Sequence, residues 1–203
     1  MILVIGSSIT SGFVKSVSAD QGFDLENVSY EYEFGKTLSI TATVPQIENI
    51  KSISVSIQPE NLQPRQINGE IGNDSQVNAT FDLQTNSISP FSRVFFWFTA
   101  ELQNGTMISS PSYWFDYVDN RFPWKSNSSK LFTVYWVFED SQYGQRIQQI
   151  AKSGLERSTQ LLPVAPNIPI EIYIYPDITS MKSIFPVDSE LWVNGKAILK
   201  ANR

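Results

Sequence analysis

Glu139 and Asp140 are adjacent acidic residues at the end of an apolar segment, and two carboxylates so placed could perform general acid–base chemistry or bind a cation. Adjacent side chains at the end of a strand point in different directions, however, and acids are also favoured where a helix begins. We therefore predict a structural role for this pair at the start of a helix.

The absence of histidine and cysteine limits the remaining chemistry more strongly. Without histidine a Ser-His-Asp triad is excluded, and the usual ligands of zinc are missing. The chain also lacks the G-x-S-x-G sequence of a nucleophile elbow, and its glycines form no phosphate-binding loop. We predict no catalytic residue, no metal ligand and no cofactor in this chain.

Six consecutive residues lie where the hydrophobic periodicity changes, and we predict that they form a fixed joint between two folds: Asp119, Asn120, Arg121, Phe122, Pro123 and Trp124. Pro123 fixes the backbone and restricts Phe122 to extended conformations. Arg121 is expected to form a forked pair with a carboxylate such as Asp116 or Asp119. Phe122 and Trp124 are expected to bury against both domains, and the alternative for Trp124 is a ligand role.

Composition indicates a packed protein with two small domains. Hydrophobic residues make up 41% of the 203 residues, aromatic residues 13% and charged residues 17%. Residues 1–118 hold 5 Lys/Arg against 12 Asp/Glu, whereas residues 119–203 hold 10 against 8, which favours a boundary near 119. Neither half has a dense basic cluster, so no nucleic-acid partner is expected.

The first 19 residues suggest the end of a secretory signal, because a short apolar run is followed by Ser- and Thr-rich sequence and by Val17 and Ala19 ahead of Asp20. We therefore expect an exported protein, extracellular or in a bacterial cell envelope. The alternative is that the segment is simply a first strand. No run approaches the ~20 apolar residues of a membrane span, so no transmembrane segment is expected.

Residues 20–118 show the period-two alternation of half-buried strands. An Asn104-Gly105 turn is expected to join the last two, because both residues tolerate positive φ. Six or seven short strands in about 90 residues predict an immunoglobulin-like or fibronectin-like β-sandwich. The predicted strands cover residues 28–34, 38–44, 53–57, a segment around 67, 77–83, 93–102 and 106–117.

The strand that contains Val94–Phe98 is apolar on both faces. One face should enter the core, and the other must meet something else. We predict that loops or the next domain cover it, since a large apolar patch is costly to leave in water. The alternative is an exposed platform for a ligand.

Beyond a joint or linker at 119–130, residues 131–203 predict an incomplete α/β or α+β lobe. Its expected elements are a buried strand at 131–138, a helix at 141–162 and a strand at 170–175, then a short helix and an edge strand or hairpin at 191–199. Ser141 is expected to cap the long helix, and Asp177 or Thr179 the short one. The apolar stripe of the long helix is predicted to contain Tyr143, Ile147, Ile150, Ala151, Leu155 and Leu162.

Four sequence strings carry a resemblance to a known family: DNRFPW at 119–124, TVYW at 133–136, IEIYIYP at 170–176 and WVNGKA at 192–197. They resemble bacterial peptidase MA-like proteins, which are exported relatives of the gluzincin zinc metallopeptidases. The resemblance implies that a β-sandwich precedes the joint and that the lobe after it precedes a helix bearing H-E-x-x-H. It also implies an edge strand beside the substrate, around Gly195, Lys196 and Ala197.

The chain lacks the H-E-x-x-H helix of that family, so no family metal ligand is carried over. The resemblance implies zinc, and a peptide or protein substrate, only for a full-length parent. We expect the non-catalytic N-terminal portion of such a peptidase, with the sandwich as an accessory domain. The alternative is a stand-alone extracellular binding or adhesion module without enzymatic activity.

Overall fold

The structure, a computed structural model, describes residues 9–13, 15–17, 23–45, 48–72, 74–161, 166 and 170–184. The chain divides into two compact units, Met1–Arg121 and Phe122–Arg203. The division falls inside the segment that the sequence analysis assigned to the joint.

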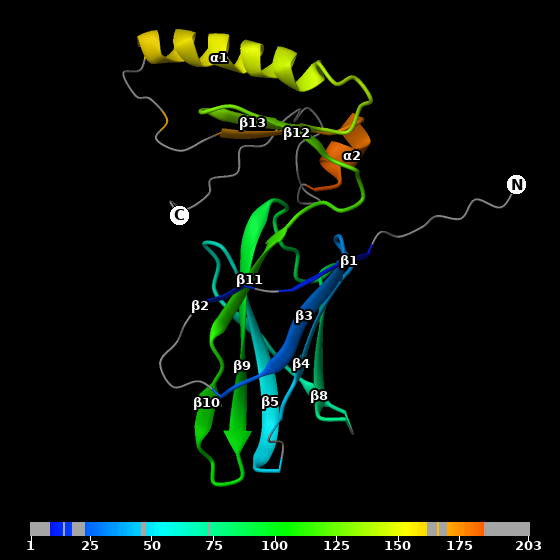
Figure 1. The fold of residues 1–203 in the computed structure, drawn as a ribbon, viewed down its shortest axis with the longest axis vertical. Helices are drawn as coiled ribbons and strands as arrows, with labels where there is room; N and C mark the ends of the chain where they lie inside the picture. Colours follow the sequence, from blue (N-terminus) through cyan, green and yellow to red (C-terminus); the bar gives the residue numbers. More distant parts are fainter. Residues whose placement is uncertain are drawn as a thin grey trace, which may run out of the picture. The chain divides into compact units, whose positions relative to one another are not determined.

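The described strands of the first unit form two antiparallel sheets, and the two sheets make a β-sandwich (Figure 1). The first sheet has the order β1-β3-β4-β8-β7, with β1 (Ile9–Phe13), β3 (Glu26–Glu33), β4 (Thr37–Thr43), β8 (Gln76–Asp82) and β7 (Glu70–Ile71). The second has the order β2-β11-β9-β5-β6, with β2 (Lys15–Val17), β11 (Ser112–Tyr117), β9 (Ser92–Leu102), β5 (Ile50–Pro59) and β6 (Arg65–Asn68). A short strand, β10 (Met107–Ser109), also pairs with β9.

The core of the sandwich follows from the alternation in sequence, because every second side chain of a strand points to the same face. Val94, Phe96 and Phe98 of β9 are fully buried, as are Leu38 and Ile40 of β4. The prediction of a β-sandwich is confirmed. Other buried apolar residues of this core are Tyr32, Ala42, Val44, Ile53, Val55, Ile57, Val77, Ala79, Phe81, Leu83, Ala100, Tyr113, Phe115 and Tyr117.

The predicted hairpin turn forms, but by a different local mechanism. Only Gly105 has a positive φ, of 83°, and its N–H donates to the Leu102 carbonyl at 2.9 Å. Asn104 instead uses its side chain, whose Oδ1 accepts from the Thr106 N–H at 2.9 Å. The asparagine therefore holds the turn through an Asx-type contact, without left-handed backbone.

The strand predicted at 106–117 is divided into β10 and β11 around Ser110 and Pro111. Thr99 pairs with Ser109, whereas Phe96 pairs with Tyr113, so the returning chain advances four residues while β9 advances three. This one-residue bulge at 110–111 changes which side chains of β11 face the core. Ser110 stays attached to β9, since its Oγ accepts from the Phe98 N–H at 3.0 Å.

Residues 9–13 and 15–17 form strands, and a first strand was the alternative to a signal sequence. β1 pairs with β3 in one sheet and β2 pairs with β11 in the other, so this segment contributes to an edge of each sheet. The export of the protein stays a prediction.

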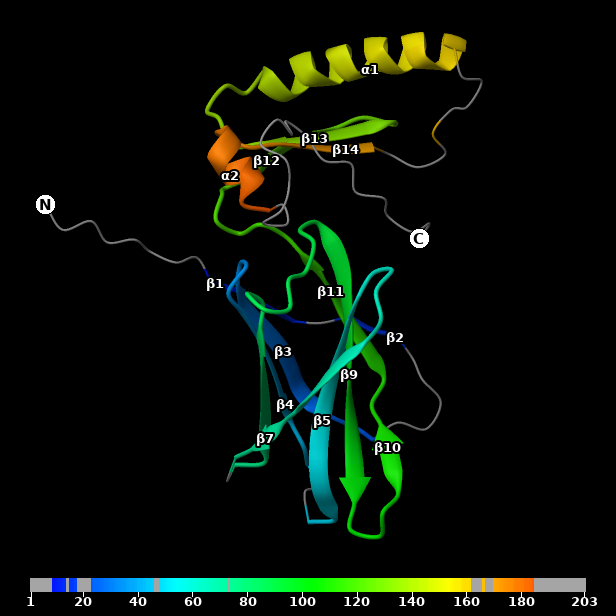
Figure 2. The ribbon, with the colours of Figure 1, turned by 180° about the vertical axis from the view of Figure 1, so that it is seen from behind.

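The second unit contains a three-stranded sheet among its described residues, in the order β12-β13-β14. Its strands are β12 (Lys125–Ser128), β13 (Phe132–Trp136) and β14 (Ile170–Ile174); β12 is antiparallel to β13, and β13 is parallel to β14. Helix α1 (Tyr143–Leu161) connects the two parallel strands and lies over one face of the sheet, and the short helix α2 (Ile178–Lys182) follows β14 (Figures 1 and 2). β12 lies within 119–130, so that segment is not only a linker.

Trp136 and Gly144 determine how closely α1 approaches the sheet. A Cβ added at Gly144 would lie 2.7 Å from Cη2 of Trp136 and 3.1 Å from Cβ of Asn127, which leaves no room for a methyl group. The indole N–H of Trp136 also donates to the Asp140 carbonyl at 3.2 Å. The turn before α1 and its first residues are therefore fixed on this ring.

Two details of α1 differ from the prediction. Ile150 is 67% exposed and does not belong to the buried stripe, because the sheet contacts the flank that carries Ile147, Ala151 and Leu155. The N-terminal side-chain contact comes from Asp140 and not from Ser141, since Oδ1 of Asp140 accepts from the Gln142 N–H at 2.9 Å.

The cap predicted for α2 is confirmed at Asp177, whose Oδ1 accepts from the Ser180 N–H at 2.8 Å. Leu162 and the edge strand predicted at 191–199, with Gly195, Lys196 and Ala197, lie outside the described residues.

We expect Gly144→Ala to destabilise the second unit by about 1–3 kcal/mol, because the added methyl must displace the Trp136 ring or the helix. Gly154→Ala is the matched control: apart from its chain neighbours and the helix backbone, nothing lies within 4 Å of a Cβ there, so the same change should be neutral or stabilise by up to ~1 kcal/mol. Denaturant unfolding followed by tryptophan fluorescence measures both. Equal effects of the two substitutions would contradict the close contact.

Candidate functional site

Two tyrosine hydroxyls hold the end of the sandwich where the chain leaves β11. The Tyr32 hydroxyl donates to the Val118 carbonyl at 3.0 Å and accepts from the Val118 N–H at 3.1 Å. The Tyr117 hydroxyl accepts from the Gly35 N–H at 2.8 Å, and burial raises the pKa of Tyr117 well above its ordinary value, so this group stays neutral. The chain therefore leaves β11 along a fixed path.

Asp119 and Arg121 form the forked pair predicted for the joint. Nε of Arg121 donates to Oδ1 of Asp119 at 2.8 Å, and one terminal nitrogen donates to Oδ2 at 2.6 Å. The Asp119 side chain is fully buried, while that of Arg121 is 37% exposed and lies with Cζ 4.8 Å from the Phe34 ring centroid. Asn120 donates from Nδ2 to the Tyr32 carbonyl at 3.2 Å. These joint residues consequently act as structural contacts of the first unit.

Phe122 and Trp124 belong to an aromatic group of the second unit, here named the Trp124 cluster: Phe122, Trp124, Tyr135, Tyr173 and Tyr175. The Trp124 ring meets Tyr175 at 5.1 Å and Tyr173 at 5.8 Å, both edge to face, and Phe122 meets Tyr175 at 5.6 Å. Tyr135 stacks on Tyr173 at 4.4 Å. Pro123, between the first two members, is exposed.

The Trp124 cluster lies on the sheet face opposite α1. Trp136 contacts α1, and neighbouring strand residues alternate between faces, so Tyr135 and its partner Tyr173 point the other way. The Tyr173 hydroxyl donates to Oε2 of Glu171 at 2.8 Å. Burial, followed by the nearby Glu171 carboxylate, raises the pKa of Tyr173 well above its ordinary value, so the phenol stays a proton donor.

The tyrosines of this cluster were not predicted as site residues from the sequence. Their signal was the pair Tyr173 and Tyr175, two residues apart in IEIYIY, together with Tyr135 in the parallel partner strand. Which face these residues share became evident only from the pairing of β13 with β14.

Glu139 and Asp140 do not form an acid–base pair. Lys125 donates from Nζ to Oε2 of Glu139 at 3.0 Å, whereas Asp140 forms an ion pair with Arg146. The Arg146 guanidinium, and then the Gln142 N–H, hold the pKa of Asp140 below its ordinary value. Both carboxylates therefore have separate structural partners near the start of α1.

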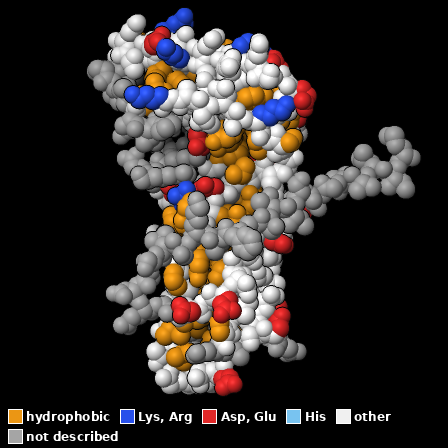
Figure 3. Space-filling model, viewed as in Figure 1, with side chains coloured by type: hydrophobic (Ala, Val, Ile, Leu, Met, Phe, Trp, Pro, Cys, Tyr) orange, Lys and Arg blue, Asp and Glu red, His pale blue; other side chains and the backbone are white. Residues whose placement is uncertain are grey.

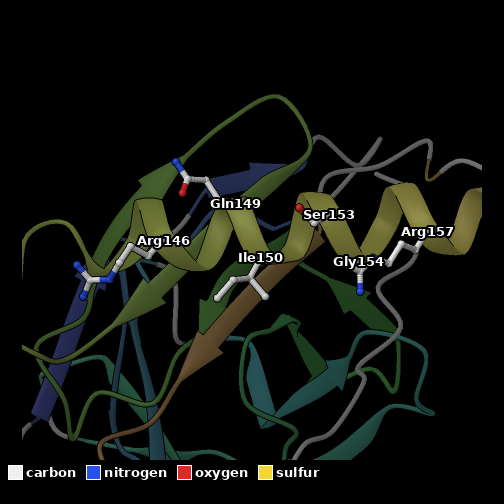
Figure 4. Close-up of a pocket in the computed structure, with 6 residues that line it drawn as sticks. All are labelled: Arg146, Gln149, Ile150, Ser153, Gly154 and Arg157. Carbon is white, nitrogen blue, oxygen red and sulfur yellow. The ribbon is translucent and has the colours of Figure 1, made fainter.

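A groove follows one exposed flank of α1, and Figure 4 shows Arg146 and Arg157 toward its two ends with Ile150 between them. Gln149, Ser153 and Gly154 complete its lining, so every lining residue comes from this helix. Such a groove is a surface feature of one element, without polar groups that converge from different elements. It does not have the character of an enclosed ligand site.

The outer face of the six-stranded sheet carries a second aromatic group, here named the β9–β11 face: Arg93, Phe95, Trp97, Trp114 and Asp116. Phe95 lies opposite Trp114, and Arg93 lies opposite Asp116. Phe95 and Trp97 are half-buried, and the prediction that loops or the next domain cover this face stays a prediction. Arg93 lies 3.6 Å from the Trp114 ring centroid and donates to Oδ1 of Asp116 at 3.2 Å.

Charge is distributed unevenly over the surface. Figure 3 shows most of the Lys and Arg side chains of this view over the part that contains α1, whereas hydrophobic patches and acidic side chains occupy much of the sandwich. Among the residues that the structure describes, there is no group of three or more His, Cys, Asp and Glu side chains placed to hold a metal. No helix in that part of the chain is long and apolar enough to cross a membrane.

Comparison with known proteins gives no family. Neither a protein-family model nor a curated protein matches the chain. Among solved structures, the bromine derivative of BhCBM56 matches with a TM-score of 0.36 and 11% identity over 48% of this chain and 96% of that one. A polysaccharide deacetylase from Bacillus cereus matches with a TM-score of 0.39 and 11% identity over 75% and 51% of the two chains.

A purple acid phosphatase from yellow lupin seeds matches with a TM-score of 0.34 and 13% identity over 81% of this chain and 35% of that one. None of these three is described as a gluzincin peptidase. At TM-scores below 0.5 these likenesses support no assignment of function.

We expect Arg121→Ala to lower the free energy of unfolding of the sandwich by about 2–4 kcal/mol, because it leaves the buried Asp119 carboxylate without its fork. Arg121→Lys should cost less, since it keeps the charge but loses the bidentate geometry. Lys36→Ala, which breaks an exposed ion pair with Glu33, should change stability by no more than ~0.5 kcal/mol. If urea unfolding shows Arg121→Ala to be as mild as Lys36→Ala, the fork does not stabilise the joint.

We expect Arg146→Gln to raise the pKa of Asp140 toward the ordinary aspartate value of about 3.9. A lowered folded-state pKa means that the interaction stabilises the fold above the unfolded-state pKa and is lost as the pH falls through the folded-state value. Carboxyl NMR titration measures the shift. Arg157→Gln, from the other end of the groove, should leave the Asp140 titration unchanged.

Proposed function

We propose that this chain is the non-catalytic N-terminal portion of an exported zinc metallopeptidase of the peptidase MA-like type. In this proposal the first unit is an accessory sandwich of the immunoglobulin or fibronectin kind. The second unit is the start of the catalytic lobe, an incomplete α/β arrangement. The substrate of the full-length protein would be a peptide or a protein.

The observation that carries the proposal is the composition of the Trp124 cluster. Phe122 and Trp124 come from the DNRFPW string, Tyr135 from TVYW, and Tyr173 and Tyr175 from IEIYIYP. Three of the four strings that carry the resemblance therefore meet in one packed group. Mutual packing gives a physical reason for these strings to occur together in one chain.

The residues present do not fit a zinc site of the family, because the sequence has no histidine to supply imidazole ligands. The chemistry would have to come from another part of a longer protein. The two units described would then position that part and contribute to substrate binding.

The length and metal content of the native gene product test this proposal. We expect the protein isolated from its source to continue beyond residue 203 into an H-E-x-x-H segment, to contain about one zinc per molecule and to cleave casein in a chelator-sensitive way. The recombinant 203-residue chain should bind no zinc and cleave nothing. Mass spectrometry and metal analysis decide the question, and a native product that ends near residue 203 and folds without zinc would contradict the proposal.

A second candidate function is a binding module, favoured by the β9–β11 face. Phe95 and Trp97 leave part of their ring surface exposed on a regular, fixed sheet. A rigid aromatic surface loses little conformational entropy on binding, which suits recognition of an extended ligand.

A further inference from the structure

Three aromatic side chains of the β9–β11 face lie on two neighbouring strands of one sheet. Phe95 and Trp97 are two residues apart on β9 and point to the same side, so their positions are about 7 Å apart along the strand. Trp114 lies directly opposite Phe95 on β11. The three positions are therefore neighbours on one face of the sheet.

These rings are not part of the sandwich core. The core is supplied by the alternate residues Val94, Phe96 and Phe98, which are fully buried. Phe95 and Trp97 occupy the other face and remain half-buried. Removing one of them should therefore leave the fold intact while changing the surface.

The charged groups of this face neutralise each other. Arg93 is 17% exposed, donates to Asp116 at 3.2 Å and lies over the Trp114 ring. At the far end of β9, Lys51 pairs with Glu101 at 2.6 Å. The charges of these two pairs are therefore balanced, and Lys15 of the edge strand β2, the register partner of Trp114, places one further positive residue next to the rings.

The polar groups beside the rings are neutral hydroxyls and an amide. Gln58 lies opposite Phe95 on β5, and Ser54 lies opposite Thr99. The Ser54 hydroxyl donates to the Thr99 carbonyl at 3.2 Å, which fixes its direction. The Ser54 hydroxyl also accepts from Nε2 of Gln66 at 2.6 Å, and Nε2 of Gln58 donates to the Leu62 carbonyl at 3.1 Å. An amide has a second N–H and an oxygen besides that donated bond.

We propose that the β9–β11 face binds a neutral polysaccharide. A sugar ring has an apolar C–H face that packs on an aromatic ring and hydroxyls at its edge that bond to neutral polar groups, and this face supplies both side by side. A protein partner is disfavoured because protein interfaces commonly use complementary charges, and the Arg93 and Asp116 charges beside the rings are already paired with each other. The proposal rests on the second candidate function and does not depend on zinc or on peptidase activity.

Retention of the recombinant chain on defined polymers tests this site. We expect binding to at least one of cellulose, chitin, xylan and laminarin, with little change between about 0.05 and 0.5 M NaCl, because the ligand carries no charge. Trp97→Ala should weaken binding at least about tenfold, and Trp97→Phe should weaken it less because it keeps an aromatic ring. Ile71→Ala removes a 38% exposed apolar side chain from the other sheet and should change nothing. Thermal unfolding by circular dichroism confirms that each variant is folded.

The possible outcomes separate the ligand class from the binding function. Retention on gelatin or casein alone would overturn the polysaccharide and leave a protein-binding module, and retention on polygalacturonate alone would overturn the neutral ligand. Polysaccharide binding that is unchanged in both Trp97→Ala and Phe95→Ala would overturn the site. Absence of binding to every polymer would overturn the proposal and the second candidate function together, without bearing on the peptidase proposal.

Discussion

Strand β9 carries apolar side chains on both of its faces, and the sandwich is built around this strand. It pairs with β5 on one side and with β10 and β11 on the other, so its backbone groups are used along most of its length. Its inner residues Val94, Phe96 and Phe98 complete the core with no exposed surface. Its outer residues are nevertheless aromatic at Phe95 and Trp97, which the sandwich itself does not require. An antiparallel sheet with one solvent-exposed face usually carries polar residues on that face, and β9 carries aromatic residues there instead.

The chain on either side of Arg121 is anchored within its own unit. Before that point, the Asp119–Arg121 fork and the Tyr32 hydroxyl attach the exit strand to the sandwich. After it, Phe122 and Trp124 pack on Tyr173 and Tyr175. Pro123 lies between these two sets of contacts, and its ring fixes φ at that position.

Much of the architecture could be predicted from local patterns, because the period-two alternation in β4 and β8 leaves only one way to bury their apolar residues. The sequence did not predict which of two similar residues, close together in the chain, makes a given contact. Asp119 and Asp116 were equal candidates for Arg121 until the pairing of β9 with β11 placed Asp116 beside Arg93. Ser141 was expected to cap α1, but the side-chain contact at the start of the helix comes from Asp140, which also pairs with Arg146.

The prediction for Ile150 failed for a related reason. A helical stripe can extend to either flank, and periodicity does not say which flank the sheet touches. The close approach of Gly144 to Trp136 determines which flank of α1 faces the sheet. Similarly, the sequence showed that the strand at 94–98 has two apolar faces, but only the register with β11 showed that Trp114 and Phe95 lie together.

The bulge at 110–111 has a consequence for how this fold can vary in length. The extra residue places Tyr113 and Phe115 inside the sandwich and leaves Trp114 and Asp116 on the outer side with Arg93. With one residue fewer at this point, every side chain of β11 would exchange faces, and an aspartate would enter the core. The tip of the hairpin at Asn104 can accept insertions and deletions, whereas this position can change only by two residues at a time.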